Sequence, residues 1–300
     1  MDALTREFYE MKFKLAFFEK KGNEFQDFFA DIMEKVHPAN FMRVRPWGKA
    51  GDRKNDGYLK SARTLFQVYA PNEIKPSSTI AKIDEDFRGA LPFWEVHFDR
   101  WVFVHNSASG LGPDVTKTLL DLAKAHPAIS VQSWGQEELR QKVFALNAHD
   151  LASLFGSAPT SRDMRELGLE VLAPVLDQIG RLPAPPTPDL RPPPADKITR
   201  NMLSESIELL LKAGMGRADL VKKYFRAQPT HQDEIAESFR VRYRQLRSEG
   251  MAPDRIFPEL QKFAGGDTVG TGSHQAAVLA VLAFFFEECE IYERDTGSTS

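Results

Sequence analysis

A proline-rich segment divides the chain into two parts that are expected to fold in different ways. Residues 183–194 contain seven prolines in twelve positions. Proline lacks the amide hydrogen and the free φ angle that a helix interior or a central strand needs, so this segment runs as an extended, semi-stiff spacer. We therefore predict a first domain at residues 1–160, a helix and the proline-rich linker at residues 161–195, and a second domain at residues 196–295.

The part before the spacer alternates helical and strand-like patterns. Residues 23–36 place six apolar side chains at the spacing of one helix face. Further helices are expected at 78–89, 114–125, 135–146 and 161–180, and short apolar runs predict strands at 41–45, 65–70, 100–104 and 129–133. Strands interleaved with helices indicate an α/β sandwich for the first domain.

The part after the spacer carries only helical patterns. They cover residues 198–213, 216–226, 230–248, 253–264 and 273–293 and predict an all-α second domain. The last of these helices is apolar on nearly every side between Ala276 and Phe286, which indicates burial on several sides. Burial within its own domain and contact with a second subunit both fit this pattern, so an oligomer stays an open alternative.

Length and composition indicate a globular protein of the cytoplasm. The chain has 300 residues, of which 42% are hydrophobic, enough for two cores. The apolar run from Ala276 to Phe286 is about half of what a bilayer-spanning helix needs, and the N-terminal segment is charged rather than a signal peptide, so no membrane partner is expected. A single cysteine, Cys289, excludes an internal disulfide and a multi-cysteine zinc site.

Basic residues gather in one stretch of the first domain. The formal net charge of −3 gives no global attraction to nucleic acid, but residues 41–63 hold seven Lys or Arg against two Asp. Phosphate contacts would come from Arg43, Arg45, Lys49, Arg53, Lys54 and Lys60. A solvated loop explains the same charges equally well.

The same stretch contains a glycine-flanked acidic turn that feeds an apolar strand. Phosphodiester hydrolysis needs carboxylates that hold Mg²⁺ and leave room for a phosphate and a water. Asp56, between Asn55 and Gly57, is the best candidate for such a ligand, although turns favour these residue types for conformational reasons alone. Gln67 and Tyr69 lie two apart on the strand and share a face. Glu24 is either a further ligand or merely a first-turn acid that the helix dipole favours.

Several of these runs together resemble one nuclease family. Residues 22–26, 51–52, 55–57 and 67–69, followed by 101–106, 129–135 and 150–156, look like the Mrr-type branch of the PD-(D/E)xK nucleases, with the similarity spanning roughly residues 8–156. The resemblance implies a restriction-endonuclease-like α/β sandwich and a DNA endonuclease that depends on Mg²⁺ or Mn²⁺. Asp56 and Gln67 would serve in catalysis and, with Glu24, in metal binding.

One family residue is replaced in this chain. The branch commonly has glutamine at the position of Gln67, but the lysine that follows it in the family is Tyr69 here. We expect Lys82, on the following helix, to supply the missing charge, with Lys60 and Lys75 as nearby alternatives. If no lysine reaches the site, the domain would bind DNA without cutting it.

The end of the chain resembles a second family. The apolar run from Ala276 to Cys289 looks like the C-terminal domain of ABC-three-component antiphage systems, which are related to Lamassu. The resemblance implies a partner ATPase of the ABC or SMC type, and a third small subunit is an open alternative. The glycine-rich loop before the last helix lacks the lysine and serine or threonine of a P-loop, so the chain is expected to have no ATPase of its own. A nuclease effector, an inactive DNA-binding relative and an adaptor all remain open.

A row of arginines lies on one predicted helix of the second domain. These are Arg240, Arg242, Arg244 and Arg247. They could follow a DNA backbone, dock an acidic partner or form a plain solvated face. The seven histidines show no pair at metal-ligand spacing.

Overall fold

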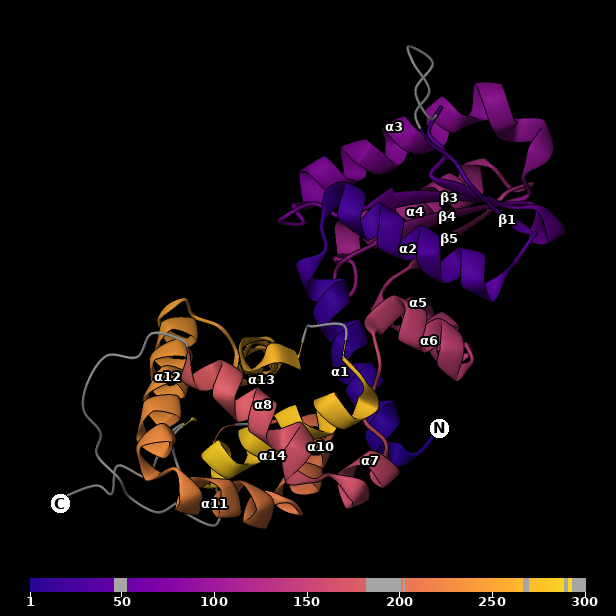
Figure 1. The fold of residues 1–300 in the computed structure, drawn as a ribbon. Helices are drawn as coiled ribbons and strands as arrows, with labels where there is room; N and C mark the ends of the chain where they lie inside the picture. The colour runs from indigo at the N-terminus through magenta and orange to yellow at the C-terminus, as the bar shows by residue number, and fades with distance from the viewer. Residues whose placement is uncertain (46–52, 182–200, 202, 267–269, 289–290, 293–300) are drawn as a thin grey trace. The chain divides into compact units, whose positions relative to one another are not determined.

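The chain divides into two compact units, one formed by residues 16–154 and the other by residues 1–15 together with 155–300 (Figure 1). The computed structural model describes residues 1–45, 53–181, 201, 203–266, 270–288 and 291–292. Lys49, Gly51, Asp52, the proline-rich spacer and Cys289 lie outside the described residues. Residues 161–181 fall within the second unit and not in a linker between two domains, which differs from the predicted boundaries.

The first unit is built on a mixed sheet of five strands among its described residues, in the order β1-β2-β3-β4-β5. Strands β1 (Phe41–Arg43), β2 (Gly57–Leu59) and β3 (Thr64–Tyr69) are antiparallel. Strands β4 (Arg100–His105) and β5 (Ser130–Trp134) continue the sheet parallel to β3. The α/β prediction is confirmed. The sequence pattern missed β2 because three residues are too few to show an alternation.

Helices cover both faces of this sheet. On one face, Phe29 of α2 (Gly22–Val36) packs against Phe66 of β3, with ring centroids 5.3 Å apart. On the other face, Ile83 and Phe87 of α3 (Pro76–Trp94) share a core with Leu65, and α4 (Pro113–Ala125) contributes to the same core. Because Leu65 and Phe66 are successive strand residues, their side chains identify the two opposite faces. The first unit thus has three layers and continues into α5 (Gln136–Phe144) and α6 (Ala148–Phe155).

The second unit contains only helices among its described residues. They are residues 3–15 of α1 (Ala3–Glu19), α7 (Ser161–Glu166), α8 (Leu169–Gly180), α10 (Glu205–Met215), α11 (Ala218–Ala227), α12 (Pro229–Ser248), α13 (Pro253–Gln261) with a π-helical turn at Lys262–Gly266, and α14 (Gly272–Glu287). The helix predicted at 161–180 is two helices, because the backbone is extended at Gly168. No described helix is both long and apolar enough to cross a bilayer.

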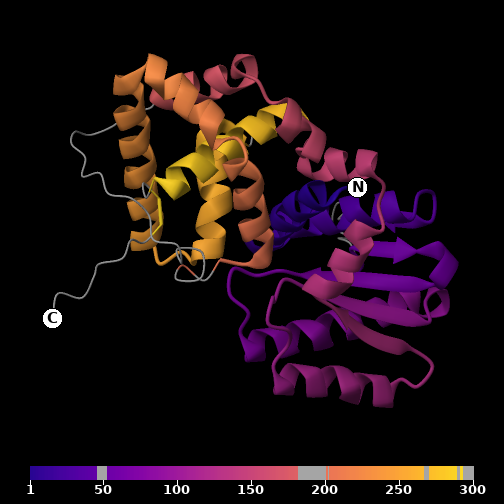
Figure 2. The ribbon, with the colours of Figure 1, turned by 90° about the horizontal axis from the view of Figure 1, so that it is seen from below.

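Helix α14 forms the centre of the second unit (Figure 2). Every residue from Gln275 to Phe286 is buried. Helices α7, α8, α10, α11 and α13 pack around it. Burial within its own unit, one of the two predicted alternatives, therefore accounts for the apolar run.

We expect Gly214→Ala to destabilise the second unit. A methyl group at Gly214 of α10 would collide with the carbonyl oxygen of Leu279 and lie 2.7 Å from Cβ of Ala283, both on α14. Overpacking of this kind typically costs about 1–3 kcal/mol. Urea unfolding should show this loss, whereas Gly112→Ala, where a methyl group meets nothing within 4 Å, should leave the free energy of unfolding nearly unchanged. Equal stability of the two variants would contradict the close approach of α10 and α14.

The arginine row on α12 is largely paired inside the unit. Arg240 is buried and donates to Glu237 over 2.5 Å, and Arg244 lies 3.8 Å from the same carboxylate. Arg242 donates to Glu259 of α13 over 3.4 Å. Arg240, Arg242 and Arg244 thus have glutamate partners in their own unit, which none of the three predicted alternatives included.

Candidate metal and phosphate site

Asp56 lies just before β2 and is bonded to β3 through both its backbone and its side chain. Its amide donates to the carbonyl of Phe66 over 2.9 Å, and its Oδ2 accepts from the amide of Val68 over 2.7 Å. Its Oδ1 accepts from Nε2 of Gln26 on α2 over 3.1 Å. Since the residue is only 8% exposed, Asp56 is a fixed, nearly buried carboxylate and not merely an acid in a surface turn.

The turn in front of Asp56 is tightly constrained. The amide of Gly57 donates to Oδ1 of Asn55 over 3.0 Å, and Asn55 is fully buried. A side chain at Gly57 would collide with the ring of Phe41, so packing requires glycine here. Arg53 and Lys54 have φ angles of 53° and 62°, in the left-handed region that disfavours residues with a Cβ. The segment from 53 to 57 is therefore held in one strained conformation.

Gln67 and Tyr69 share the face of β3 that α3 covers, since they alternate with Phe66 and Val68 and follow Leu65 on its side of the sheet. Gln67 is 3% exposed, and its Oε1 has no hydrogen-bond partner. The ring of Tyr69 lies 6.0 Å from that of Phe103. The spacing of Gln67 and Tyr69 in the sequence predicted that they share a face of the strand, and the structure agrees. However, Asp56 bonds to a helix on the opposite face, so the expected convergence of Gln67 and Asp56 on one face is not what the structure shows.

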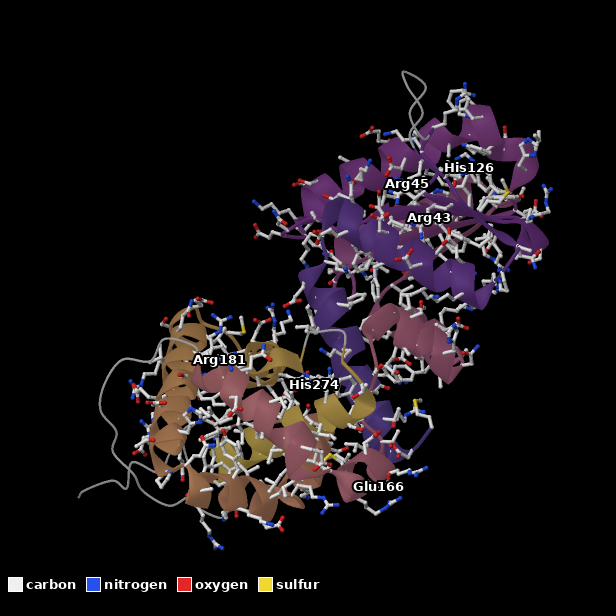
Figure 3. The ribbon with its side chains drawn as sticks, viewed as in Figure 1. Arg43, Arg45, His126, Glu166, Arg181 and His274 are labelled. Carbon is white, nitrogen blue, oxygen red and sulfur yellow. The ribbon has the colours of Figure 1, made fainter. Side chains whose placement is uncertain are left out.

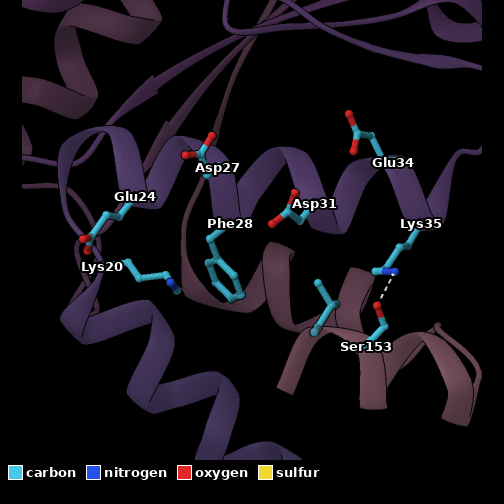
Figure 4. A pocket seen from close by; sticks show the side chains of 9 residues that line it. Lys20, Glu24, Asp27, Phe28, Asp31, Glu34, Lys35 and Ser153 are labelled. Atoms are coloured by element: carbon cyan, nitrogen blue, oxygen red, sulfur yellow. Dashed lines mark hydrogen bonds between the residues drawn. The ribbon is translucent and has the colours of Figure 1, made fainter. Parts of the chain in front are cut away.

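Glu24 does not accompany Asp56. Helix α2 presents Gln26 to Asp56, and a residue two positions earlier lies about 200° around the helix axis. Glu24 is exposed and lines a separate pocket of about 630 Å³ with Lys20, Asp27, Phe28, Asp31, Glu34, Lys35, Ser153 and Leu154 (Figure 4). The positions of the two residues around the helix axis thus place Glu24, the predicted metal ligand, away from Asp56. Gln26 contacts Asp56 instead.

The donor set at Asp56 suits a hard cation that takes few ligands from the protein. Among the residues that the structure describes, no three His, Cys, Asp or Glu side chains come together to hold a metal. The Asp56 carboxylate supplies oxygen donors, the kind that Mg²⁺ prefers. Mg²⁺ commonly binds through one or two carboxylates and completes its shell with waters and substrate phosphates. A divalent cation at Asp56 therefore fits only if waters and substrate phosphates supply its remaining ligands.

The predicted basic patch is divided by acids of the same unit. Arg43 pairs with Asp31 and Glu34 of α2, and Arg45 pairs with Asp27 of the same helix. Both arginines are labelled in Figure 3. The guanidinium of Arg53 lies over the ring of Phe93, 4.4 Å from its centroid. Lys60 is exposed in the turn Lys60–Ala62, which begins just after β2, whereas Asp56 lies just before that strand. These residues do not form one continuous phosphate-facing surface.

Lys82 and Lys54 instead meet at a buried acid on α3. Nζ of Lys82 lies 2.8 Å and Nζ of Lys54 lies 3.2 Å from the same oxygen, Oδ1 of Asp86. Lys54 also pairs with Glu85. Asp86 is 0% exposed, and its Oδ2 has no hydrogen-bond partner. Burial raises the pKa of Asp86, while the two lysines act in the opposite direction. The lysine predicted for catalysis is thus held by Asp86.

His105, at the end of β4, should make stability depend on pH. Burial lowers its pKa from 6.5 to about 4, against an opposing effect of Glu138, while its Nδ1 accepts from the amide of Ser107 over 3.2 Å. Because the folded pKa lies below the unfolded value, the stabilisation is complete above pH 6.5 and is lost as the pH falls toward 4, by up to about 3 kcal/mol.

Urea unfolding of the wild type and His105→Asn at several pH values between 7 and 4.5 checks this expectation. The variant should lose less stability on acidification than the wild type, because asparagine does not titrate. His149→Asn, at an exposed position, is the matched control and should follow the wild type. An identical pH dependence for all three proteins would show that His105 is not kept neutral by burial.

Comparison with known families identifies the helical unit. Residues 170–293 match the family model for C-terminal domain 10 of the ABC-three component systems. No curated protein and no solved structure matches the chain. The matched region starts in α8, contains the buried α14 and lies within the second unit. The resemblance of the chain's end to an ABC-three component domain is confirmed, and this supports a role in a multi-component bacterial defence system.

Two residues of the site were missed in the sequence. Gln26 follows the buried Phe25 and borders the apolar face of α2. Its position beside that face was the sequence signal that could have marked it as a site residue. Asp86 falls among the buried Thr79, Ile83 and Phe87 of α3, so a charged residue in an apolar stripe could have marked it. The ABC-three component match does not reach either residue.

Proposed function

We propose that the chain is a DNA endonuclease, dependent on Mg²⁺ or Mn²⁺, that serves as the effector of an antiphage defence system and acts with a partner ATPase. The observation that carries this proposal is the Asp56 carboxylate, fixed by the Val68 amide of β3 in an α/β unit. The ABC-three component domain that follows it supports the defence role and the dependence on partners.

The chain's own residues would fix the carboxylate before substrate arrives. The Val68 amide and the Gln26 side chain each hold one oxygen of Asp56, so it does not need to reorient during the reaction. Each carboxylate oxygen carries two lone pairs, so a hydrogen bond from the protein does not by itself exclude a cation. A divalent cation bound there would polarise the scissile phosphate and lower the pKa of a water.

A second candidate is a catalytically inactive DNA-binding or adaptor subunit of the same kind of system. Two observations favour it. Tyr69 occupies the position of the family lysine, and its ring packs against Phe103. In addition, no trio of metal-binding carboxylates, histidines or cysteines assembles among the described residues. The endonuclease and the inactive DNA-binding subunit share DNA binding and differ only in chemistry, whereas the adaptor does not require DNA binding.

The deciding experiment incubates the full chain with supercoiled plasmid DNA, alone and with the products of neighbouring genes. Mg²⁺, Mn²⁺ or EDTA is present, with and without ATP. We expect nicked or linear DNA with either metal and none with EDTA, and stronger cleavage with the partner ATPase and ATP. Salt-dependent DNA binding without cleavage under every condition would favour the inactive DNA-binding subunit. Absence of DNA binding would leave the adaptor.

A further inference from the structure

We propose that Lys54, Lys82 and Asp86 form a phosphate clamp, in which the buried acid holds two ammonium groups side by side to bind a phosphate of the DNA backbone. The clamp rests on the proposed function in that it specifies how the first unit holds DNA. It does not require that the DNA be cut.

The clamp joins two separate segments of the chain at one oxygen atom. Lys82 is on α3, four residues before Asp86, and Lys54 comes from the strained segment two residues before Asp56. Among the described residues, these two lysines are the hydrogen-bond partners of the Asp86 side chain, which is wholly buried. A buried carboxylate costs free energy unless it is paired, so Asp86 requires the lysines to stay in place.

The backbone around Lys54 is shaped to deliver its side chain to Asp86. Arg53 and Lys54 have left-handed φ angles, which residues with a Cβ seldom adopt. In addition, α3 has a glycine where the Lys54 stem passes, since a methyl group at Gly89 would lie 2.8 Å from Cγ of Lys54. Strained backbone of this kind concentrates at binding and catalytic sites.

Both ammonium groups are partly open to solvent. The Lys54 and Lys82 side chains are 29% and 30% exposed, so both reach solvent while they hold Asp86. Each ammonium has three N–H donors, and Asp86 takes one from each lysine. Glu85, whose side chain is 62% exposed, also pairs with Lys54. A phosphate that enters the clamp would replace this exposed carboxylate and leave the buried one in position.

Binding of a short fluorescent DNA duplex to the full chain tests the clamp. The titration is carried out in EDTA over a range of salt concentrations, so that cleavage plays no part. Lys54→Asn keeps a residue that tolerates a left-handed backbone, and Lys82→Met keeps the stem. Each should lower the slope of log affinity against log salt by about 1 and weaken binding about tenfold. Arg88→Met is the matched control, because Arg88 is an exposed cation of α3 paired with Asp84 four residues earlier.

Two acid variants separate a clamp from a structural ion pair. Asp86→Asn should lower the salt slope, because the lysines lose the group that holds them, and Lys82→Arg should restore more binding than Lys82→Met. Glu85→Gln should raise the affinity severalfold, and more than Asp84→Asn, which removes an exposed carboxylate at the neighbouring position. Unfolding transitions measured in parallel would identify any variant that fails to fold.

The clamp is overturned if the lysine variants bind DNA like Arg88→Met, if the Asp86 variant loses only stability, or if the full chain shows no salt-dependent binding. The outcomes for the clamp and for the nuclease are distinguishable. DNA binding that depends on Lys54 and Lys82 without any cleavage would remove the nuclease proposal and keep the clamp. DNA cleavage that depends on Asp56, together with unaltered DNA binding by the lysine variants, would remove the clamp and keep the nuclease proposal.

Discussion

Replacing Asp56 by asparagine should abolish metal-dependent DNA cleavage while the fold is kept. The change removes the negative charge that would hold the cation, and a bound metal supplies several kcal/mol of transition-state stabilisation. Because each 1.36 kcal/mol is a factor of ten in rate, we expect a loss of about a thousandfold or more. The assay is plasmid cleavage under the condition in which the wild type is most active.

Asparagine is the right replacement because both oxygens of Asp56 have structural partners. Its side-chain carbonyl can still accept from the Val68 amide, and its amide group can meet a rotated Gln26. Alanine would leave the buried Val68 amide unsatisfied, at a cost of about 1–3 kcal/mol. Asp84→Asn, at an exposed acid of α3, is the matched control and should cleave like the wild type. Unchanged cleavage by Asp56→Asn would remove Asp56 from the mechanism.

Truncation of Phe285 should have the largest effect on stability. Phe285 of α14 is 0% exposed, and its ring centroid lies 5.1 Å from those of both Phe239 and Phe284. Removing a buried phenylalanine typically costs about 3–5 kcal/mol, through lost transfer free energy and the cavity that is left. We therefore expect Phe285→Ala to lower the free energy of unfolding by this amount in urea titrations followed by circular dichroism.

Phe93→Ala provides the matched control for this loss. Phe93 is 47% exposed at the end of α3, so its truncation removes little buried surface. The free energy of unfolding of Phe93→Ala should stay within about 1 kcal/mol of the wild-type value, since substitutions at exposed positions seldom change it by more. If Phe285→Ala were as stable as Phe93→Ala, the central position of α14 would be wrong.

Helical and strand periodicities predicted most of the architecture correctly. The apolar face of α2, the strands β3 and β4 and the apolar α14 follow directly from spacing, because burial on one face imposes a period on the sequence. Strand β2 was missed because its three residues owe their conformation to the neighbours on each side. The break at Gly168 was missed because residues 161–180 read as one helical segment.

The candidate site was predicted less completely, because contacts between separate elements leave little trace in a sequence. Asp56 could be selected from its glycine-flanked turn. Glu24 and Gln26 are two residues apart, and only the phase of α2 against the sheet decides which of them meets Asp56. Likewise, the predicted cations Arg43 and Lys54 pair with acids on α2 and α3, and no local pattern indicates those pairings.

The location of the divalent cation tests the central claim most directly. Fe²⁺, ascorbate and peroxide, added to the full chain with bound DNA, generate hydroxyl radicals where the ion binds, and mass spectrometry of the protein fragments locates the backbone cuts. A metal held by Asp56 predicts cuts at the start of β2 and near Val68 of β3, suppressed by excess Mg²⁺ and absent in Asp56→Asn. Cuts confined to other segments, or an unchanged pattern in the variant, would contradict a metal site at Asp56.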